Sequence, residues 1–191
     1  MCKLEKNYQI CSRCIYDTST SSIKFDNDGV CNYCHQVEKL ITEYGTGSKK
    51  GEKIFNLILE EIKLAGRDKK YDCIIGVSGG TDSSYLVKAA KKDWGLRPLA
   101  VHYDNTWNSA IATMNIHAVL SKLDVDLETY VVSNKEADDI FKSFFLAGVA
   151  EIEASTDLAY AYVLRSKAAK WNINYVLEGH SFTEEGITPL G

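Results

Sequence analysis

The segment CIIGVSGGTDSS (residues 73–84) carries the strongest structural signal in the chain. It begins with an apolar run, Cys73 to Val77, that has the composition of a buried strand. Two glycines and several small polar residues follow, and YLVKAA (85–90) then indicates a helix. A strand that turns tightly into a helix N-terminus is typical of an anion-binding site, because free backbone N–H groups and the helix dipole point there. The alternative is an ordinary Ser/Asp helix cap after a glycine turn.

The residues of this loop suit phosphate binding, but they do not match the two best-known phosphate-binding motifs. Glycines let the backbone approach a phosphate closely. Hydroxyl donors are supplied by Ser78, Thr81, Ser83 and Ser84. The lysine and the spacing of G-x-x-x-x-G-K-[ST] are absent, which excludes a Walker loop, and G-x-G-x-x-G is absent as well.

Outward from the loop, two kinds of apolar periodicity alternate, which is the pattern of βα units that form a parallel sheet. We predict strands at 71–77, 98–103, 127–132 and 173–179. We predict helices at 54–66, 82–94, 108–123, 136–148 and 155–171. The expected fold is therefore α/β, with a doubly wound, mostly parallel sheet.

Global composition limits the possible classes of protein. The chain has 191 residues, a formal net charge of −4 and 45% hydrophobic residues, which is enough for one medium domain with a sizeable core. No stretch approaches the roughly 20 apolar residues of a membrane span, and the N-terminus lacks the apolar core of a signal peptide. We expect a cytoplasmic protein without a membrane partner. The acidic balance argues against a nucleic-acid binder.

Four cysteines near the N-terminus give a second specific signal. Cys11 and Cys14 form CSRC, and Cys31 and Cys34 form CNYC. This spacing predicts a four-thiolate Zn²⁺ site, which is structural because it leaves no open position for water. Two disulfides are the alternative, but nothing suggests secretion. We predict a zinc-binding module at 1–45, a Gly/Lys-rich connector at 46–53 and the α/β domain at 54–191.

The C-terminal segment raises a question of completeness. No helix follows the last predicted strand, although both faces of a parallel sheet need cover. We expect that the chain is a C-terminally truncated part of a longer protein. A tail on a complete domain is the alternative.

Taken together, these residues resemble a known superfamily. SGGTDSS after a strand resembles the S-G-G-x-D-S pyrophosphate-binding loop of the PP-loop (N-type) ATP pyrophosphatases, which have an adenine nucleotide α-hydrolase-like fold. The segments AVHYDNTWNS (100–109) and LEGHSF (177–182) follow predicted strands where that superfamily contacts adenosine and phosphates.

The resemblance implies ATP and Mg²⁺ as cofactors and a set of site residues. Asp82 would hold Mg²⁺ or cap its helix, and it is one of two implied catalytic residues, with His180. The implied nucleotide-binding residues are Val77, Ser78, Gly79, Gly80, Thr81, Asp82, Ser83, Ser84, Val101, His102, Tyr103, Asp104 and Gly179. Asp157, in TDLAY, would contact substrate or cap a helix.

Within the superfamily, the chain is most similar to the N-acetyl-sugar amidotransferases of surface-polysaccharide biosynthesis. The shared features are the paired C-x-x-C knuckles before the loop and the segments YDNTWNS, TDLAY and EGHSF…EGITPLG. The resemblance implies that ATP adenylates the acetamido oxygen of an N-acetyl sugar, possibly nucleotide-linked. Ammonia from a separate glutaminase then gives an acetamidino group. Members are nearly twice as long, so sugar-binding residues of a missing half cannot be assigned.

Two alternative functions remain open at the level of sequence. One is a tRNA-thiolating PP-loop enzyme, against which stand the acidic balance, the lack of a spare cysteine beside the loop and the absence of G-H-x-x-D-D. The other is a nucleotide-binding module that turns nothing over, which is the expected behaviour of a truncated chain.

Overall fold

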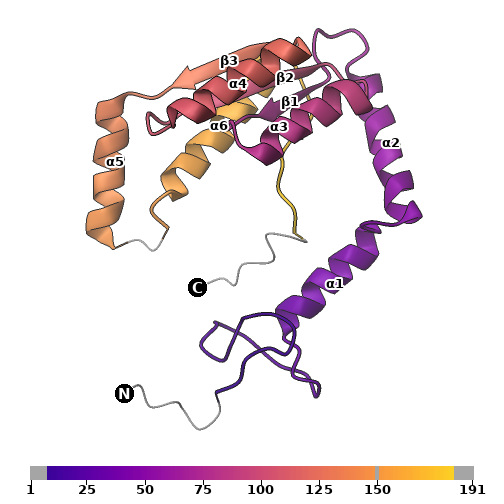
Figure 1. Cartoon of the computed structure of the whole chain (residues 1–191), viewed down its shortest axis with the longest axis vertical. Coiled ribbons are helices and arrows are strands. Elements are labelled where there is room, and N and C mark those ends of the chain that lie inside the picture. The colour runs from indigo at the N-terminus through magenta and orange to yellow at the C-terminus, as the bar shows by residue number, and fades with distance from the viewer. Residues whose placement is uncertain (1–7, 149–150, 183–191) are drawn as a thin grey trace. The chain divides into compact units, whose positions relative to one another are not determined.

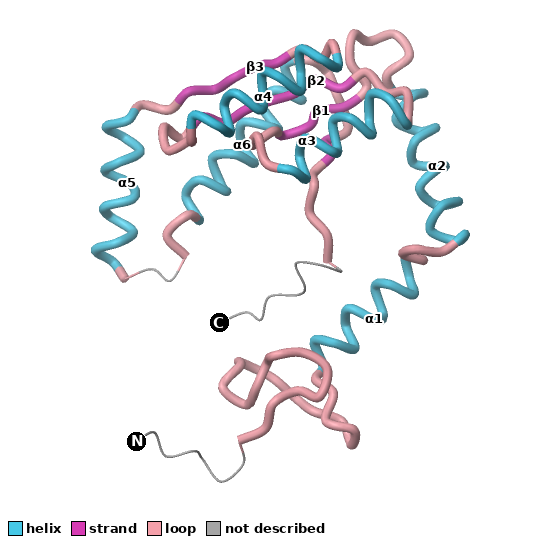
Figure 2. The backbone as a smooth tube through the Cα atoms, viewed as in Figure 1, coloured by secondary structure: helices cyan, strands magenta, loops and turns pink. Residues whose placement is uncertain are grey.

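The computed structural model describes residues 8–148 and 151–182, which cluster into two compact units (Figures 1 and 2). Among the described residues, one unit comprises 8–57 together with 180–182, and the other comprises residues between Ile58 and Gly179. The segment EGITPLG (185–191) lies outside the described residues.

The first unit contains a helix that we did not predict. Helix α1 (Asn32–Tyr44) starts directly after Cys31, which is its N-cap residue, and ends at Gly45 in the left-handed conformation (φ 66°). None of the side chains of α1 is buried, although Val37, Leu40, Ile41 and Tyr44 recur at the i, i+3, i+4, i+7 spacing of one helix face. Two isolated antiparallel bridges, Ile10 with Asp17 and Phe25 with Cys31, order the chain before it.

Helix α2 (Lys49–Ala65) begins inside the segment that we predicted to be a connector, so residues 49–53 are helical. Ser48 explains the early start. Its carbonyl accepts a hydrogen bond from the Glu52 N–H (3.0 Å), and its hydroxyl accepts one from the Gly51 N–H (3.4 Å). Ser48 therefore satisfies donors of the first turn that would otherwise lack partners.

The second unit is built on a parallel sheet of four strands in the order β3-β2-β1-β4, which confirms the predicted fold class. The strands are β1 (Cys73–Gly76), β2 (Pro98–Asp104), β3 (Leu127–Val131) and β4 (Val176–Leu177). The last strand is much shorter than the predicted 173–179, and its register partners in β1 are Ile74 and Ile75.

The helices of this unit lie close to their predicted positions. They are α3 (Thr81–Lys88), which continues into the π-helical turn η1 (Ala89–Asp93), α4 (Ala110–Leu123), α5 (Asn134–Ala147) and α6 (Ala154–Lys170). None of the described helices combines the length and the apolarity needed to cross a bilayer.

Alternating strand residues build a separate apolar core on each face of the sheet. In β1, Cys73 and Ile75 pack with residues of α2, α3 and α4, whereas Ile74 packs with Val163 and Leu164 of α6. Each such side chain contributes roughly 1.5–3 kcal/mol when fully buried. Helices therefore cover both faces, as Figure 1 shows for α4 and α6, and the sheet is doubly wound.

The order of the strands fixes where a ligand site is expected. From β1 the chain moves outward to β2 and β3, and it then returns to add β4 on the other side of β1. In open α/β sheets, ligands bind beyond the carboxyl ends of the strands where this reversal occurs. The segment 77–84 leaves the carboxyl end of β1 at that point.

Candidate functional site

The loop between β1 and α3 is held in place by the backbone of α4. Gly79 has a φ of +79°, and a Cβ at this position would lie 2.2 Å from the carbonyl oxygen of Ala112. Asn115 also donates a hydrogen bond from Nδ2 to the Gly79 carbonyl oxygen (3.2 Å). A residue with a side chain would have to adopt a rarely populated backbone conformation and displace α4, so the position requires glycine.

Hydroxyl groups close the loop on itself. The Ser83 hydroxyl oxygen accepts a hydrogen bond from the Ser78 N–H (3.3 Å) and lies 3.3 Å from the Ser78 hydroxyl oxygen. The Ser78 hydroxyl also accepts from the Gly80 N–H (3.4 Å). These contacts keep the loop compact and leave the hydroxyl groups at its surface, where they can donate to a ligand.

The first turn of α3 provides the donors of an anion site. Its N-cap residue is Gly80, which has no side chain to satisfy the first turn, so the N–H groups of Thr81, Asp82 and Ser83 have no acceptor within the helix. The positive end of the helix dipole lies at the same place. The loop therefore has the geometry and polarity to bind a phosphate group.

Asp82 sits in the first turn of α3 and is exposed, and Gly80 rather than Asp82 is the N-cap residue. Of the two roles that we considered for Asp82, the structure does not show a side-chain cap. Gly179 lies against it, because a Cβ on Gly179 would be 3.6 Å from the Asp82 Cβ. The fold thus brings the LEGHSF segment next to the loop at Gly179. His180 belongs to the other unit.

Buried His102 links the loop to the segment after β2. Its Nδ1 lies 2.8 Å from the Val77 carbonyl oxygen, which only accepts, so Nδ1 carries a hydrogen. Its Nε2 lies 3.3 Å from Asn108 Nδ2, an amide donor that also donates to Asp104 Oδ1 (2.8 Å). The hydrogen bonds assign a neutral imidazole with the proton on Nδ1. His102 positions the base of the loop rather than reaching the loop surface.

The other residues predicted at the end of β2 divide between core and cavity. Val101 is fully buried with Val163 in the core beneath α6, and its carbonyl oxygen accepts from the Val77 N–H (2.9 Å). Asp104 accepts hydrogen bonds from Asn108 and from the Thr106 N–H (2.8 Å). Tyr103 lines a cavity at the carboxyl ends of β1 and β2, so it can contact a ligand there.

A cavity of about 200 Å³ opens at the carboxyl ends of β1 and β2. It is lined by Val77, Ser78, His102, Tyr103, Asn105, Asn108, Thr156, Asp157 and Tyr160. Asp157 lines this loop-side cavity from the first turn of α6, whose N-cap residue is Glu153. Helix α6 forms one wall of this cavity with residues of TDLAY. The sequence pattern did not reveal this wall, because it depends on tertiary packing.

Tyr160 is fitted to the end of β1. A Cβ on Gly76 would lie 1.6 Å from the Tyr160 hydroxyl oxygen, so the absence of a side chain at Gly76 makes room for the tyrosine ring. Burial, and secondarily the charge of Glu178, raises the pKa of Tyr160 to about 12. The hydroxyl therefore stays protonated at neutral pH and can donate a hydrogen bond in the loop-side cavity.

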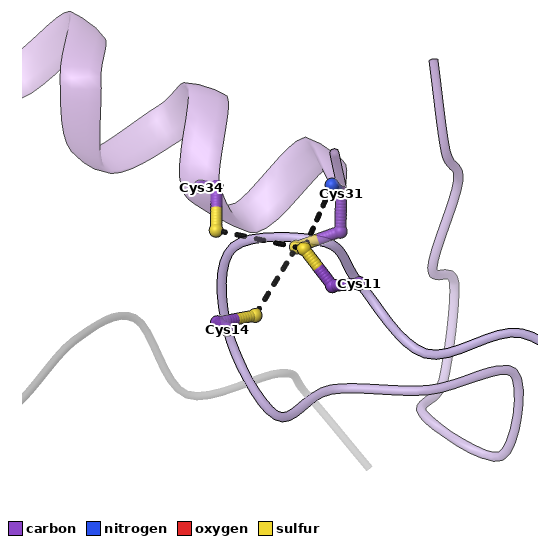
Figure 3. Close-up of side chains that lie close together, drawn as sticks. All are labelled: Cys11, Cys14, Cys31 and Cys34. Carbon is purple, nitrogen blue, oxygen red and sulfur yellow. Dashed lines mark hydrogen bonds between the residues drawn. The ribbon is translucent and has the colours of Figure 1, made fainter. Parts of the chain in front are cut away.

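The four cysteines of the first unit lie together as the spacing predicts (Figure 3). The Sγ atoms of Cys11 and Cys34 are 3.9 Å apart and those of Cys14 and Cys31 are 3.7 Å apart, and all four lie within 4.8 Å of one another. Tetrahedral Zn–S bonds of about 2.3 Å place neighbouring sulfurs about 3.8 Å apart. The four thiol groups therefore fit a structural metal ion such as Zn²⁺.

Backbone N–H groups converge on one of these sulfurs. Cys11 Sγ accepts from the Cys31 N–H (3.3 Å) and the Arg13 N–H (3.4 Å). Burial by itself raises the pKa of Cys11, but backbone N–H groups, that of Arg13 first, outweigh it and lower the pKa to about 6. These contacts favour a thiolate, which is the form that binds a metal. The sulfurs are not joined in disulfides.

His35 does not point at the cysteines. Its Nε2 lies 2.7 Å from Asp26 Oδ2 and its Nδ1 lies 3.1 Å from Glu38 Oε2, and Glu38 also binds Arg13. Hydrogen bonding to Asp26, and then to Glu38, raises the pKa of His35. The residue thus ties the start of α1 to the preceding turn.

The fold defines the class of protein to which the second unit is similar. Two solved structures resemble the chain: an NH3-dependent NAD synthetase from Campylobacter jejuni (14% identity, TM-score 0.50) and an NMN synthetase from Francisella tularensis (16% identity, TM-score 0.52). Each alignment covers 70% of this chain, and 58% and 54% of the respective structures. At this level of identity the likeness shows the fold, which is α/β and NAD synthetase-like.

In sequence, the chain is 28% identical over 171 residues to an uncharacterised protein of Methanocaldococcus jannaschii. The match covers 89% of this chain and 58% of that relative, so the chain spans less than two thirds of the relative's length. No family model matches the sequence.

Proposed function

We propose that the chain is the ATP-binding part of an amidotransferase that adenylates the acetamido oxygen of an N-acetyl sugar and replaces that oxygen with ammonia. The observation that carries the proposal is the loop at 78–84, in which Gly79 packs against α4 and the first turn of α3 presents its N–H groups. The NAD synthetase-like fold supports it, since one of the proteins with this fold is an NH3-dependent NAD synthetase.

The chemistry follows from the weakness of an amide as an electrophile. The amide oxygen attacks the α-phosphorus of ATP, the bond to the β-phosphate oxygen breaks, and pyrophosphate leaves. The product is an O-adenylated imidate, whose leaving group is good. Ammonia adds to its carbon, the C–O bond breaks with its electron pair on AMP, and the nitrogen loses a proton to give the amidine. Stabilisation of the departing pyrophosphate by preorganised N–H donors lowers the first barrier.

Each loop residue has a defined role in this proposal. The N–H groups of the first turn and the hydroxyls of Ser78, Thr81, Ser83 and Ser84 would bind the β- and γ-phosphates. Asp82 would hold the Mg²⁺ ion that accompanies ATP, since a bare carboxylate would repel the phosphates. Tyr103 would border the adenosine, and His102 would position the loop from below. Gly179, which follows β4, would approach the phosphates, and the role of His180 stays what the resemblance implies.

The cysteine module has a structural role in the proposal. Four thiolates around Zn²⁺ leave no coordination position for water or substrate, so the metal would stabilise the module and take no part in the reaction. A separate glutaminase would supply ammonia. The described residues include no cysteine suited to that chemistry, because Cys73 is buried and desolvation raises its pKa to about 12.

The same cysteine argument weighs against tRNA thiolation. A sulfur carrier needs an accessible thiol with thiolate character near the loop. Among the described cysteines, four are grouped in the module and Cys73 is buried in strand β1. The amidotransferase proposal therefore accounts for the described residues better than thiolation does.

ATP binding is the first test. We expect isothermal titration calorimetry to detect ATP binding in the presence of Mg²⁺. Ser78→Ala should weaken it about ten- to a hundredfold, because it removes one hydrogen bond to a charged group. Ser121→Ala, at an exposed site of α4, is the matched control. Equal affinities for all three proteins would refute the assignment of the loop.

Isotope transfer tests the reaction itself. The full-length protein would be incubated with ATP, ammonium chloride and a nucleotide-linked N-acetyl sugar that carries ¹⁸O in its acetamido group. We expect mass spectrometry to find ¹⁸O in AMP and a nitrogen in place of oxygen in the sugar. AMP without ¹⁸O, or AMP formation that requires tRNA, would contradict the proposal.

A further inference from the structure

A second, larger cavity lies beside the loop-side cavity, in the second unit. It has a volume of about 440 Å³ and is bordered by residues of β2, β3, α5 and α6. Tyr103 lines both cavities. A narrow space of about 50 Å³ lies between them, and it shares Asn105 and Thr156 with the loop-side cavity. A ligand in the larger cavity can therefore extend an arm toward the loop.

Regular secondary structure builds the walls of this larger cavity. Tyr103 of β2 and Tyr130 of β3 are register partners, and their rings are stacked with centroids 6.1 Å apart and planes at 18°. Helix α6 contributes Tyr162 together with Ala159 and Val163, which is an i, i+3, i+4 face. The walls are thus on rigid elements rather than on loops.

Helix α5 closes the opposite side with an equivalent face of Glu136, Asp139 and Ile140. The helix is anchored next to the cavity by Phe141, which is buried and stacks on Trp107 with ring centroids 4.6 Å apart. Glu136 and Asp139 therefore line the same cavity as the tyrosines. Among the described residues no lysine or arginine lines it.

This combination of side chains selects a chemical class of ligand. Tyrosine rings pack against apolar C–H faces and their hydroxyls form hydrogen bonds at the edge. Carboxylates accept hydrogen bonds from hydroxyl groups but repel phosphates and other anions. The volume lies within the range of small-molecule sites. An uncharged ring with hydroxyl groups on its edge and C–H groups on its face meets all of these conditions.

We propose that the cavity formed by Tyr103, Tyr130, Tyr162, Glu136 and Asp139 binds the hexosamine ring of the acceptor. This inference rests on the proposed function, because it places the acceptor next to the phosphates. The ring lies between the tyrosines of β2 and β3 and Tyr162, with its hydroxyls on Glu136 and Asp139. The acetamido arm passes Tyr103 toward Asn105 and the loop, which is where adenylation takes place.

Saturation-transfer NMR on the whole protein tests the cavity without turnover. The probes are N-acetylglucosamine, N-acetylgalactosamine and N-acetylmannosamine, each with and without excess adenosine. We expect saturation of the ring protons of at least one sugar, and its persistence when adenosine is added. Tyr162→Ala should weaken that binding about tenfold, and Glu136→Gln about threefold. Tyr85→Ala, 65% exposed on α3 against 71% for Tyr162, is the matched control and should change nothing.

Three results would overturn the inference: no saturation of any sugar, equal binding by wild type and Tyr162→Ala, or displacement of the sugar by adenosine, which would make the cavity a nucleoside site. ATP titrations on the same variants separate this inference from the proposed function. Unaltered ATP binding with lost sugar binding supports the cavity even if no amidine forms. Amidine formation that is insensitive to Tyr162→Ala leaves the proposed function intact and refutes the cavity.

Discussion

The two units of the chain are stabilised in different ways. In the second unit, apolar side chains fill a core on each face of a parallel sheet. Before Leu59, in contrast, the buried apolar side chains of the described residues are those of Cys11 and Cys31. A segment that buries so little apolar surface cannot offset the conformational entropy of folding by burial alone. Its order must come from bonds to the sulfurs.

The two candidate sites differ in the same way in how they relate to the core. In the first unit, the candidate metal ligands are themselves the buried core, so metal binding and folding are coupled. In the second unit, the loop and both cavities lie at the edge of a core that exists without them. We therefore expect ligand removal to unfold the module and to leave the α/β unit folded.

Removal of metal should have the largest effect. Cys14→Ser removes a sulfur that lies 3.7 Å from Cys31 Sγ, and apparent free energies of structural Zn²⁺ binding are about 10–16 kcal/mol. We expect this variant to lose bound zinc and the hydrogen-exchange protection of residues 8–44. Protection of the strands of the α/β unit should be unchanged, as measured by mass spectrometry.

Cys73→Ala is the matched control for this experiment. Cys73 is fully buried in β1, so the substitution should leave the zinc content intact and lower the free energy of unfolding of the α/β unit by about 1–2 kcal/mol. If the module kept its protection in Cys14→Ser or after chelation, the proposed contrast between the units would be wrong.

A substitution in the loop should have an intermediate effect on stability. It tests whether the loop at the edge of the α/β core is held rigidly. Gly79→Ala places a Cβ 2.2 Å from the Ala112 carbonyl oxygen at a φ of +79°. We expect a loss of about 2–3 kcal/mol in the free energy of unfolding, from left-handed strain and displacement of α4. Urea denaturation followed by circular dichroism measures it.

Gly80→Ala is the natural comparison within the same loop. A Cβ on Gly80 meets only the Ser78 hydroxyl oxygen at 3.4 Å, and its φ is −79°. Because alanine is a poorer N-cap residue than glycine, the free energy of unfolding of this variant should fall by about 0.5–1 kcal/mol, clearly less than in Gly79→Ala. Equal destabilisation by the two substitutions would show that the packing of the loop on α4 is not what fixes its shape.

The sequence predicted the α/β fold because each element carries its own signal. The apolar runs of β1 and β2 and the periodicities of the helices placed the elements of the second unit closely. Helix α1 was missed although Val37, Leu40, Ile41 and Tyr44 have the spacing of one helix face, because the whole segment was interpreted as part of the zinc-binding module. The shortness of β4 was missed because it depends on pairing with β1, which is not local.

The candidate sites also include parts that the sequence predicts and parts that it does not. The cysteine cluster and the loop are local motifs, so spacing alone predicted them. The fit of Tyr160 over Gly76, the linking role of His102 and the cavity around Tyr130 depend on strand register and on the path of α6. Such contacts join residues distant in sequence, and only the folded chain shows them.

The smallest effect concerns charge in the α/β unit, where Glu128 joins β3 to the end of α6. Its carboxylate binds Lys167 Nζ (2.6 Å), Lys170 Nζ (2.8 Å) and Trp171 Nε1 (2.7 Å), and its side chain is 19% exposed. Burial alone raises the pKa of Glu128, but these partners, Lys167 first, outweigh it and lower the pKa to about 2. Because the folded pKa lies below the unfolded one, the stabilisation is present above pH 4.5 and is lost as the pH falls toward 2.

Glu128→Gln keeps a hydrogen-bond acceptor for Trp171 and removes the charge. We expect it to lower the free energy of unfolding by about 1–2 kcal/mol at pH 7, with the difference from wild type falling to less than about half of that at pH 3. Urea denaturation at both pH values measures the difference. If the difference in free energy of unfolding between wild type and variant stays constant with pH, then hydrogen bonding rather than charge holds α6 to β3. In the first unit the variant should leave metal binding unchanged, because Glu128 belongs to the core that forms without metal.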